Sequence, residues 1–168
     1  MTLYKNLGML DEAGEIAEEM KQSGLLTDSV SFTKIMACYA MNNQLAECGH
    51  LLHEMVKQNI IPDIGTFKVL FTVLKKGGMS SEAVKQLDNA FREGMPYSRH
   101  AIVACVFSAV GLDNLAVESC NALTKVKRVD RFVYNAAIYC YGVCGEIDKA
   151  LNLFMRMQDE GYEPDLLT

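Results

Sequence analysis

Residues 131–165 read RFVYNAAIYCYGVCGEIDKALNLFMRMQDEGYEPD, and this stretch decides the fold. Apolar side chains recur at helical spacing in its first half, Gly142 and Gly145 interrupt that pattern, and a second apolar helical stripe follows. The second stripe ends at Gly161, a residue suited to a left-handed helix cap, and Pro164 follows shortly after. The stretch therefore predicts a helical hairpin closed by Pro-Asp.

The same hairpin recurs along the chain with a spacing of 35 residues. Asp28 and Asp63 stand 35 residues apart, as do Asp130 and Asp165. Asp63 and Asp130 are separated by 67 residues, which is three fewer than two units. The spacing is still regular up to Gly94, so the missing residues lie after it. A fixed period of this length is typical of stacked helical pairs that bury their apolar faces against one another.

We therefore expect an all-α, right-handed α-solenoid of about four to five helix-turn-helix repeats of ~35 residues, forming one array over residues 1–168. The register between residues 95 and 130 is open by one or two positions, and we expect an irregularity of stacking in the shortened repeat. The predicted units are a partial repeat at 1–28, repeats at 29–63 and 64–98, a degenerate repeat at 99–130, a repeat at 131–165, and the start of another at 166–168.

A 35-residue hairpin that ends in Pro-Asp, with Tyr134-Asn135 near its start and Gly145, Ala150 and Gly161 within it, resembles the pentatricopeptide repeat of plant organellar RNA-binding proteins. The copy at 131–165 matches throughout, and nearly the whole chain is covered. The tetratricopeptide repeat is the competing interpretation, but its 34-residue period and its tryptophan are absent. The resemblance implies a chloroplast protein, or alternatively a mitochondrial one, although the chain shows no transit segment of its own.

Charge is distributed unevenly between the two helices of each predicted hairpin. The chain carries a net charge of −5. The first-helix windows (29–43, 64–78, 99–112 and 131–145) contain six of the 16 basic residues and none of the 21 acidic ones. This pattern predicts a mildly positive first-helix surface and an acidic second-helix surface. Alternatively, the first helices are simply more buried and therefore poor in acids.

No pattern of catalytic or cofactor-binding residues appears, so we expect neither an enzyme nor a cofactor, a small-molecule substrate or a membrane partner. Cys48, His50 and His53 lie close on one predicted helix, but periodicity turns the cysteine inward and the histidines outward, which argues against a metal site. Cys140 and Cys144 stand one turn apart and could form half a metal site, although packing explains them better. The six cysteines form no CxxC pair and are interpreted as reduced, buried thiols.

The family resemblance implies that one repeat faces one base of single-stranded RNA. Its fifth and last residues read the base edge, and its second residue packs against the base planes. A repeat-final aspartate is a hydrogen-bond acceptor, and among RNA bases only uracil and guanine present an imino N–H on the Watson–Crick edge. The competing explanation is that Asp63 and Asp165 are helix caps, and that Thr33 and Asn135 lie on an ordinary exposed helix face.

Carried over residue by residue, the resemblance implies a target of the form G-n-n-U. The predicted base-reading pairs are Thr33 with Asp63 for guanine, Asn135 with Asp165 for uracil, and Lys68 with Ser98 without an assigned base; Val30 and Phe132 stack on bases, and Lys34 and Lys76 contact phosphates. Val103, fifth in its repeat if counted from Arg99, is apolar and can read no base edge.

These features predict sequence-specific binding of single-stranded RNA in organellar RNA processing, stabilisation, splicing or translation. The alternative function is a protein–protein scaffold in an organellar transcription or ribonucleoprotein complex, with the acidic second-helix surface as the interface.

Overall fold

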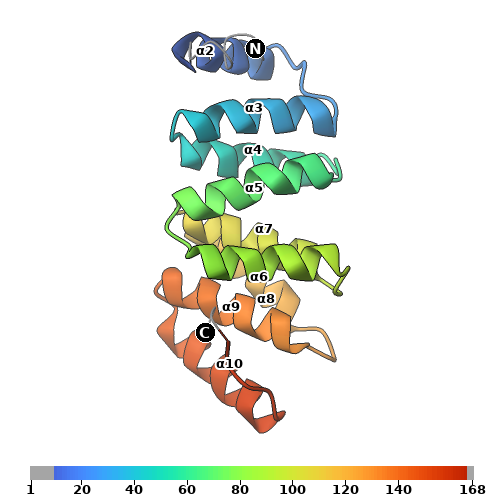
Figure 1. The fold of residues 1–168 in the computed structure, drawn as a ribbon, viewed down its shortest axis with the longest axis vertical. Helices are drawn as coiled ribbons and strands as arrows, with labels where there is room; N and C mark the ends of the chain where they lie inside the picture. Colours follow the sequence, from blue (N-terminus) through green and yellow to red (C-terminus); the bar gives the residue numbers. More distant parts are fainter. Residues whose placement is uncertain (1–9, 166–168) are drawn as a thin grey trace. The chain divides into compact units, whose positions relative to one another are not determined.

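The computed structural model describes residues 10–165, which form nine α-helices and no β-strand (Figure 1). The expected all-α helical-repeat class is confirmed. The first half-helix of the partial repeat and the start of the last repeat, predicted within residues 1–9 and 166–168, lie outside the described residues. The helices are α2 (Leu10–Gln22), α3 (Ser29–Met41), α4 (Leu45–Lys57), α5 (Ile64–Lys76), α6 (Ser81–Arg92), α7 (Ser98–Ala109), α8 (Asp113–Thr124), α9 (Arg131–Val143) and α10 (Ile147–Asp159).

A residue with positive φ stands at each turn from a first helix to a second one. These residues are Asn43 (φ 57°), Gly78 (φ 105°), Gly111 (φ 83°) and Gly145 (φ 77°). Glycine and, less readily, asparagine tolerate this left-handed conformation. Successive turns lie 35, 33 and 34 residues apart, so two of the three missing residues precede Gly111 and one follows it. The turn residue is fifteenth in the repeats that start at 29, 64 and 131. Counted back from its turn, the shortened repeat starts at Tyr97, although α7 begins one residue later, at Ser98.

The chain forms two compact units, residues 1–76 and 77–168. The boundary follows Lys76, within the predicted 64–98 repeat, so that α5 belongs to the first unit and α6 to the second.

In the first unit α3 packs against α2, α4 and α5. The hydroxyl of Tyr39 on α3 donates to Glu18 Oε2 of α2 at 2.9 Å, and this hydrogen bond is the main cause of the lowered pKa of Glu18. The core of this unit includes Phe32, Ile35, Met36, Leu51, Leu52, Met55, Phe67, Leu70 and Leu74, all with at most 1% of their surface exposed.

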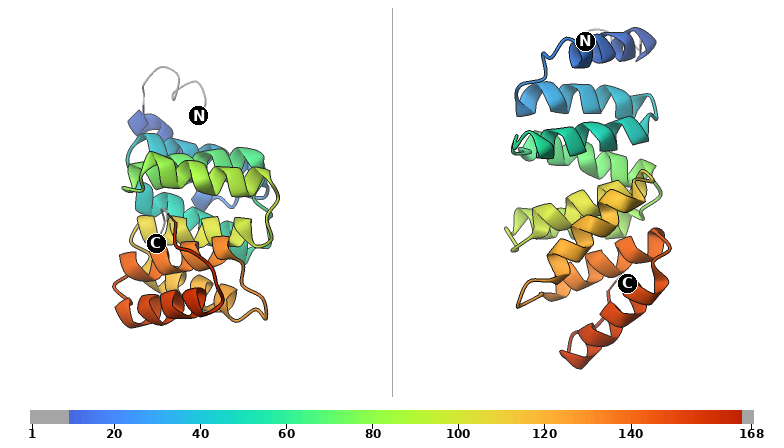
Figure 2. Two further views of the ribbon diagram at one scale, coloured as in Figure 1. Left: turned by 60° about the horizontal axis from the view of Figure 1, so that its bottom comes forward. Right: turned by 180° about the vertical axis from the view of Figure 1, so that it is seen from behind.

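In the second unit α9 contacts α7, α8 and α10 (Figure 2). The hydroxyl of Tyr141 donates to Asn121 Oδ1 of α8 at 2.7 Å, which repeats the contact of Tyr39 with the preceding second helix. Two buried thiols join α9 to α7: Cys140 Sγ of α9 lies 3.6 Å from Cys105 Sγ of α7. Nine of the thirteen α9 residues are buried, which makes α9 the central helix of this unit.

Candidate nucleic-acid interface

The repeat-final aspartates Asp28, Asp63 and Asp130 cap the first helix of the next repeat. Each carboxylate accepts a hydrogen bond from the backbone N–H three residues later, at 2.7, 2.9 and 2.9 Å respectively. The free N–H groups and the positive end of the helix dipole favour a negative charge at this position. The capping interpretation is therefore confirmed for Asp63, and it accounts for the extended backbone of Asp28 and Asp130.

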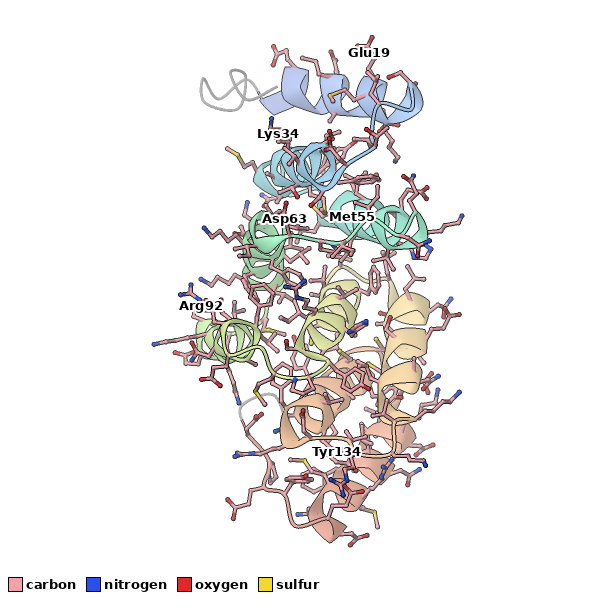
Figure 3. All side chains as sticks on the ribbon, turned by 90° about the vertical axis from the view of Figure 1, so that its right-hand side faces the viewer. Glu19, Lys34, Met55, Asp63, Arg92 and Tyr134 are labelled. Carbon is pink, nitrogen blue, oxygen red and sulfur yellow. The ribbon has the colours of Figure 1, made fainter. Side chains whose placement is uncertain are left out.

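Thr33 and Asp63, the predicted guanine-reading pair, are joined by the hydroxyl of Thr66. Thr33 Oγ1 lies 2.7 Å from Thr66 Oγ1, and Thr66 Oγ1 lies 3.1 Å from Asp63 Oδ1. Thr33 Oγ1 also lies 2.7 Å from the carbonyl oxygen of Ser29, and the hydroxyls of Ser29 and Thr66 are 3.3 Å apart. Residues from α3 and α5 thus meet in one hydrogen-bonded cluster, and Figure 3 shows Lys34 and Asp63 on the α3 and α5 side of this unit.

The pKa of Asp63 lies below its ordinary value. The main cause is the hydrogen bond from the backbone N–H of Thr66, and desolvation, the second cause, acts in the opposite direction. Asp63 is therefore ionised at neutral pH and acts only as an acceptor. Both hydrogen bonds from Thr66 use Oδ1, so the cap does not require Oδ2.

The other predicted contacts of the first unit differ in their surroundings. Val30, the predicted stacking residue, is 54% exposed, and Lys34 and Lys68 are also exposed. Lys76 is exposed as well, but its Nζ donates to the carbonyl oxygen of Ala40 at 2.7 Å. A cation at this position interacts favourably with the negative end of the α3 dipole, so Lys76 acts as a C-terminal cap of α3.

Asn135, predicted for an exposed helix face, is completely buried in α9, and this expectation is wrong. The physical reason is the central place of α9, which three helices contact. Phe132 is buried too, with 6% of its surface exposed. Asp165 accepts a hydrogen bond from the side-chain amide of Gln86 on α6. The segment that leads to it lies against α9, because Arg131 Nε donates to the carbonyl oxygen of Glu163 at 2.9 Å.

The pair of Lys68 with Ser98 divides between the two units, since Lys68 lies on α5 and Ser98 on α7. Counted from Tyr97, Ser98 is the second residue of the shortened repeat rather than the last residue of the preceding one. By the same count the fifth residue is Ala101 instead of Val103, and it is equally unable to read a base edge.

Comparisons with known proteins identify the repeat. The sequence profile described as the PPR repeat family matches residues 27–76, and that described as the PPR repeat matches residues 1–25 and 132–162. Pentatricopeptide repeat-containing protein At1g73710 of Arabidopsis thaliana is 55% identical over 171 residues, which cover 100% of this chain and 17% of that protein. The chain belongs to the pentatricopeptide repeat family.

More distant members of the pentatricopeptide repeat family carry organelle names. Arabidopsis thaliana At4g32430, mitochondrial, is 28% identical over 47% of this chain and 10% of its own length. At3g09650, chloroplastic, from the same plant, is 21% identical over 100% of this chain and 22% of its own. The crystal structure of the pentatricopeptide repeat protein PPR10 from maize has a TM-score of 0.41 and 22% identity, over 94% of this chain and 24% of that one. The chain thus spans between 10% and 24% of the length of these three relatives.

Sequence reasoning missed Thr66, the residue that links the two members of the predicted base-reading pair. The available signal was Asp63 followed three residues later by a hydroxyl side chain, a pattern similar to a capping box. The backbone N–H of Asp63 indeed donates to Thr66 Oγ1 at 3.1 Å. The hydrogen bond to Thr33 carried no such signal, because it depends on how two helices of different repeats lie side by side.

The structure also places the cysteine and the two histidines that lie close together in the sequence of α4. Cys48 is buried and His50 is exposed, as periodicity predicts, while His53 is half-buried. No group of three His, Cys, Asp or Glu side chains in this part of the chain is arranged to hold a metal ion. None of its helices is both long enough and apolar enough to span a bilayer.

Proposed function

We propose that this pentatricopeptide segment binds single-stranded RNA along its first helices, and that the Thr33–Asp63 pair reads a guanine. The observation that carries the proposal is the hydrogen-bonded connection from Thr33 through Thr66 to Asp63. An ionised Asp63 can accept the imino N–H of guanine or uracil. The short side chain of Thr33 leaves room for the larger of these two bases.

Two further features of the first unit support contact with RNA. Val30, the second residue of its repeat, offers an exposed apolar side chain against which a base can pack. Lys34 and Lys68 are exposed on α3 and α5, where neither helix carries an acidic residue, and can approach phosphates. We propose that Lys76 adds a phosphate contact through the donors that remain on its ammonium group.

We propose that the Asn135–Asp165 pair reads a uracil, and that it contributes less than the guanine pair. Asn135 is buried, so its amide must become accessible before it can meet a base, and that rearrangement lowers the apparent affinity. Phe132 has the same requirement as a stacking residue. The guanine contact should therefore dominate the recognition of G-n-n-U by this segment.

We propose an organellar role, in the chloroplast or alternatively in the mitochondrion, in transcript processing, stabilisation, splicing or translation. The organelle names of two family members support this setting. The segment itself is proposed to recognise RNA without a catalytic step.

One feature favours a second function, that of a protein-binding scaffold. A shallow groove of about 500 Å³ lies between α9 and α10. Its lining includes Val143, Ile147 and Leu151, which are 49%, 54% and 56% exposed. Exposed apolar side chains that gather in one place are typical of contact with another helical surface.

Fluorescence anisotropy with short single-stranded RNAs at low and moderate salt tests the proposal. RNA carrying G-n-n-U should bind more tightly than the same RNA carrying A-n-n-U, because adenine presents no imino N–H. Asp63→Asn is the matched variant: asparagine caps a helix as well as aspartate does but removes the charge. We expect it to reduce the preference for guanine over adenine by about ten-fold.

An Asn135→Ala, Asp165→Ala variant tests the uracil pair in the same assay against RNA carrying G-n-n-C. Binding with no base preference would leave only the lysines as contacts. Absence of binding even at low salt would contradict the RNA-binding proposal and favour the scaffold.

A further inference from the structure

Thr66 occupies a buried position between the two members of the guanine-reading pair. None of its surface is exposed, whereas Asp63 is exposed and Thr33 is partly exposed. Its Oγ1 lies within hydrogen-bonding distance of Thr33 Oγ1, Ser29 Oγ, Asp63 Oδ1 and the backbone N–H of Asp63. Thr66 itself is therefore shielded from a bound base, yet it contacts both groups proposed to touch one.

The number of hydroxyl protons limits what this cluster can present to a base. The ionised Asp63 accepts the proton of Thr66, so the single proton of Thr33 goes either to Thr66 Oγ1 or to another acceptor. Among the residues that the structure describes, the carbonyl oxygen of Ser29 also accepts from Thr33 Oγ1, at 2.7 Å. In either case the proton stays within the protein, so Thr33 has only lone pairs left for a base, as the ionised Asp63 does.

Two acceptors that are both hydrogen-bonded to Thr66 Oγ1 suit guanine, whose Watson–Crick edge has two neighbouring donors, the imino N–H and the amino group. Adenine presents an acceptor in place of the imino N–H and is therefore mismatched. Discrimination between these bases depends on the separation of the two acceptors, since a hydrogen bond weakens steeply once distance and angle are lost.

We propose that Thr66 is a positioning residue for base discrimination, which holds the Thr33 hydroxyl and the Asp63 carboxylate at the spacing that favours guanine. This inference rests on the proposed RNA-binding function. It assigns a specificity role to the third residue of the following repeat, a residue that does not face the RNA itself.

The 131–165 repeat provides an internal contrast. Its third residue is Val133, which has no hydroxyl, and the fifth residue of the preceding repeat is Ala101. Val133 still gives its backbone N–H to the capping Asp130 at 2.9 Å. A cap can therefore form without the hydroxyl link, so the link between Thr33 and Asp63 is an addition to the cap and not a requirement of it.

The test compares Thr66→Val with Thr66→Ser in the full 168-residue chain. Valine keeps the shape and the backbone N–H that caps α5 but deletes the hydroxyl, while serine keeps the hydroxyl. Thr72→Val is the matched control, because Thr72 is an exposed threonine of the same helix whose hydroxyl donates to the carbonyl oxygen of Lys68. Each variant is titrated with G-n-n-U and A-n-n-U RNAs, and its thermal unfolding is followed by circular dichroism.

For Thr66→Val we expect the preference for guanine over adenine to fall about five-fold, the factor that one neutral hydrogen bond contributes. Its affinity for the adenine RNA should stay within about two-fold of wild type, and Thr66→Ser and Thr72→Val should keep the wild-type preference. A destabilised but otherwise structural variant would lose affinity for both RNAs by the same factor, and that result would overturn the inference.

An unchanged preference in Thr66→Val would also overturn the inference, while RNA binding by the segment would stand. Equal binding of both RNAs by the wild-type chain would likewise overturn the inference but not RNA binding, because the chain would then show no discrimination between bases for Thr66 to support. If the wild-type chain bound neither RNA, the proposed function would fail, and the role of Thr66 would fail with it.

Discussion

Gly145 and Gly142 lie three residues apart at the end of α9, and alanine should have opposite effects at the two positions. Gly145 has φ +77°, and apart from Gly145 itself and its two chain neighbours no atom lies within 4 Å of the place that a Cβ would occupy. The cost of alanine there is therefore conformational and not steric. An L-residue in the left-handed region costs about 1–2 kcal/mol, and the reduced freedom of the unfolded chain offsets about 0.5 kcal/mol of that cost.

Gly142 has ordinary helical backbone and the same open space around its Cβ position. Alanine in a helix interior is favoured over glycine by about 0.8–1.0 kcal/mol, and the position near the helix end reduces this gain to about 0.5 kcal/mol. We therefore expect Gly145→Ala to lower the free energy of unfolding by about 1 kcal/mol and Gly142→Ala to raise it by about 0.5 kcal/mol.

Urea denaturation followed by circular dichroism measures both variants beside the wild type. With a slope of about 2 kcal/mol per molar urea, the two midpoints should lie about 0.7 M apart on opposite sides of the wild-type midpoint. Gly145→Asn is a useful companion, because asparagine tolerates the left-handed conformation that Asn43 adopts at the equivalent turn. A Gly145→Ala midpoint equal to or above that of wild type would refute the assignment of Gly145 as the turn residue.

Three other expectations follow from single contacts. Lys76→Met should lower the unfolding free energy by about 0.5–1 kcal/mol in urea denaturation, because it removes the cap of α3. Lys75→Met, the control, should have little effect. Equal urea midpoints for the two variants would refute the capping role of Lys76. Because the folded-state pKa of Asp63 is lowered, its contribution to stability is complete above the unfolded-state pKa and disappears as the pH falls through the folded value. The urea midpoint should therefore drop between pH 6 and pH 3, and by less in Asp63→Asn; an equal drop would contradict this linkage. The hydrogen bond to Cys105 and burial raise the pKa of Cys140. A disulfide reagent at pH 8 should therefore label the thiols of Cys105 and Cys140 only as the chain unfolds. Fast labelling of these two thiols without urea would disprove their burial.

The helical hairpins and their repeat length could be predicted from the sequence because the responsible interactions are local. Apolar periodicity defines each helix, and glycine or aspartate at a helix end satisfies backbone groups within the same few residues. Even the three missing residues were detectable from the spacing of Asp63 and Asp130. How the three missing residues are distributed before and after Gly111 could be learned only from the backbone angles. Tyr97 has a positive φ, which its residue type does not predict.

The candidate site was only half predictable for the same reason. Thr33 and Asp63 could be paired by position in the repeat, and the capping role of Asp63 follows from its place before a helix. Asn135 occupies the equivalent position in its own repeat, but its burial depends on the helices that pack around α9.

The sequence alone therefore determined the type of each element and, outside residues 95–130, its approximate ends. Tertiary structure alone decided that Thr66 joins Thr33 to Asp63 and that Lys76 reaches the end of α3. These contacts link residues 33 and 36 positions apart, so they exist only once neighbouring repeats have packed side by side and fixed the separation of their helices.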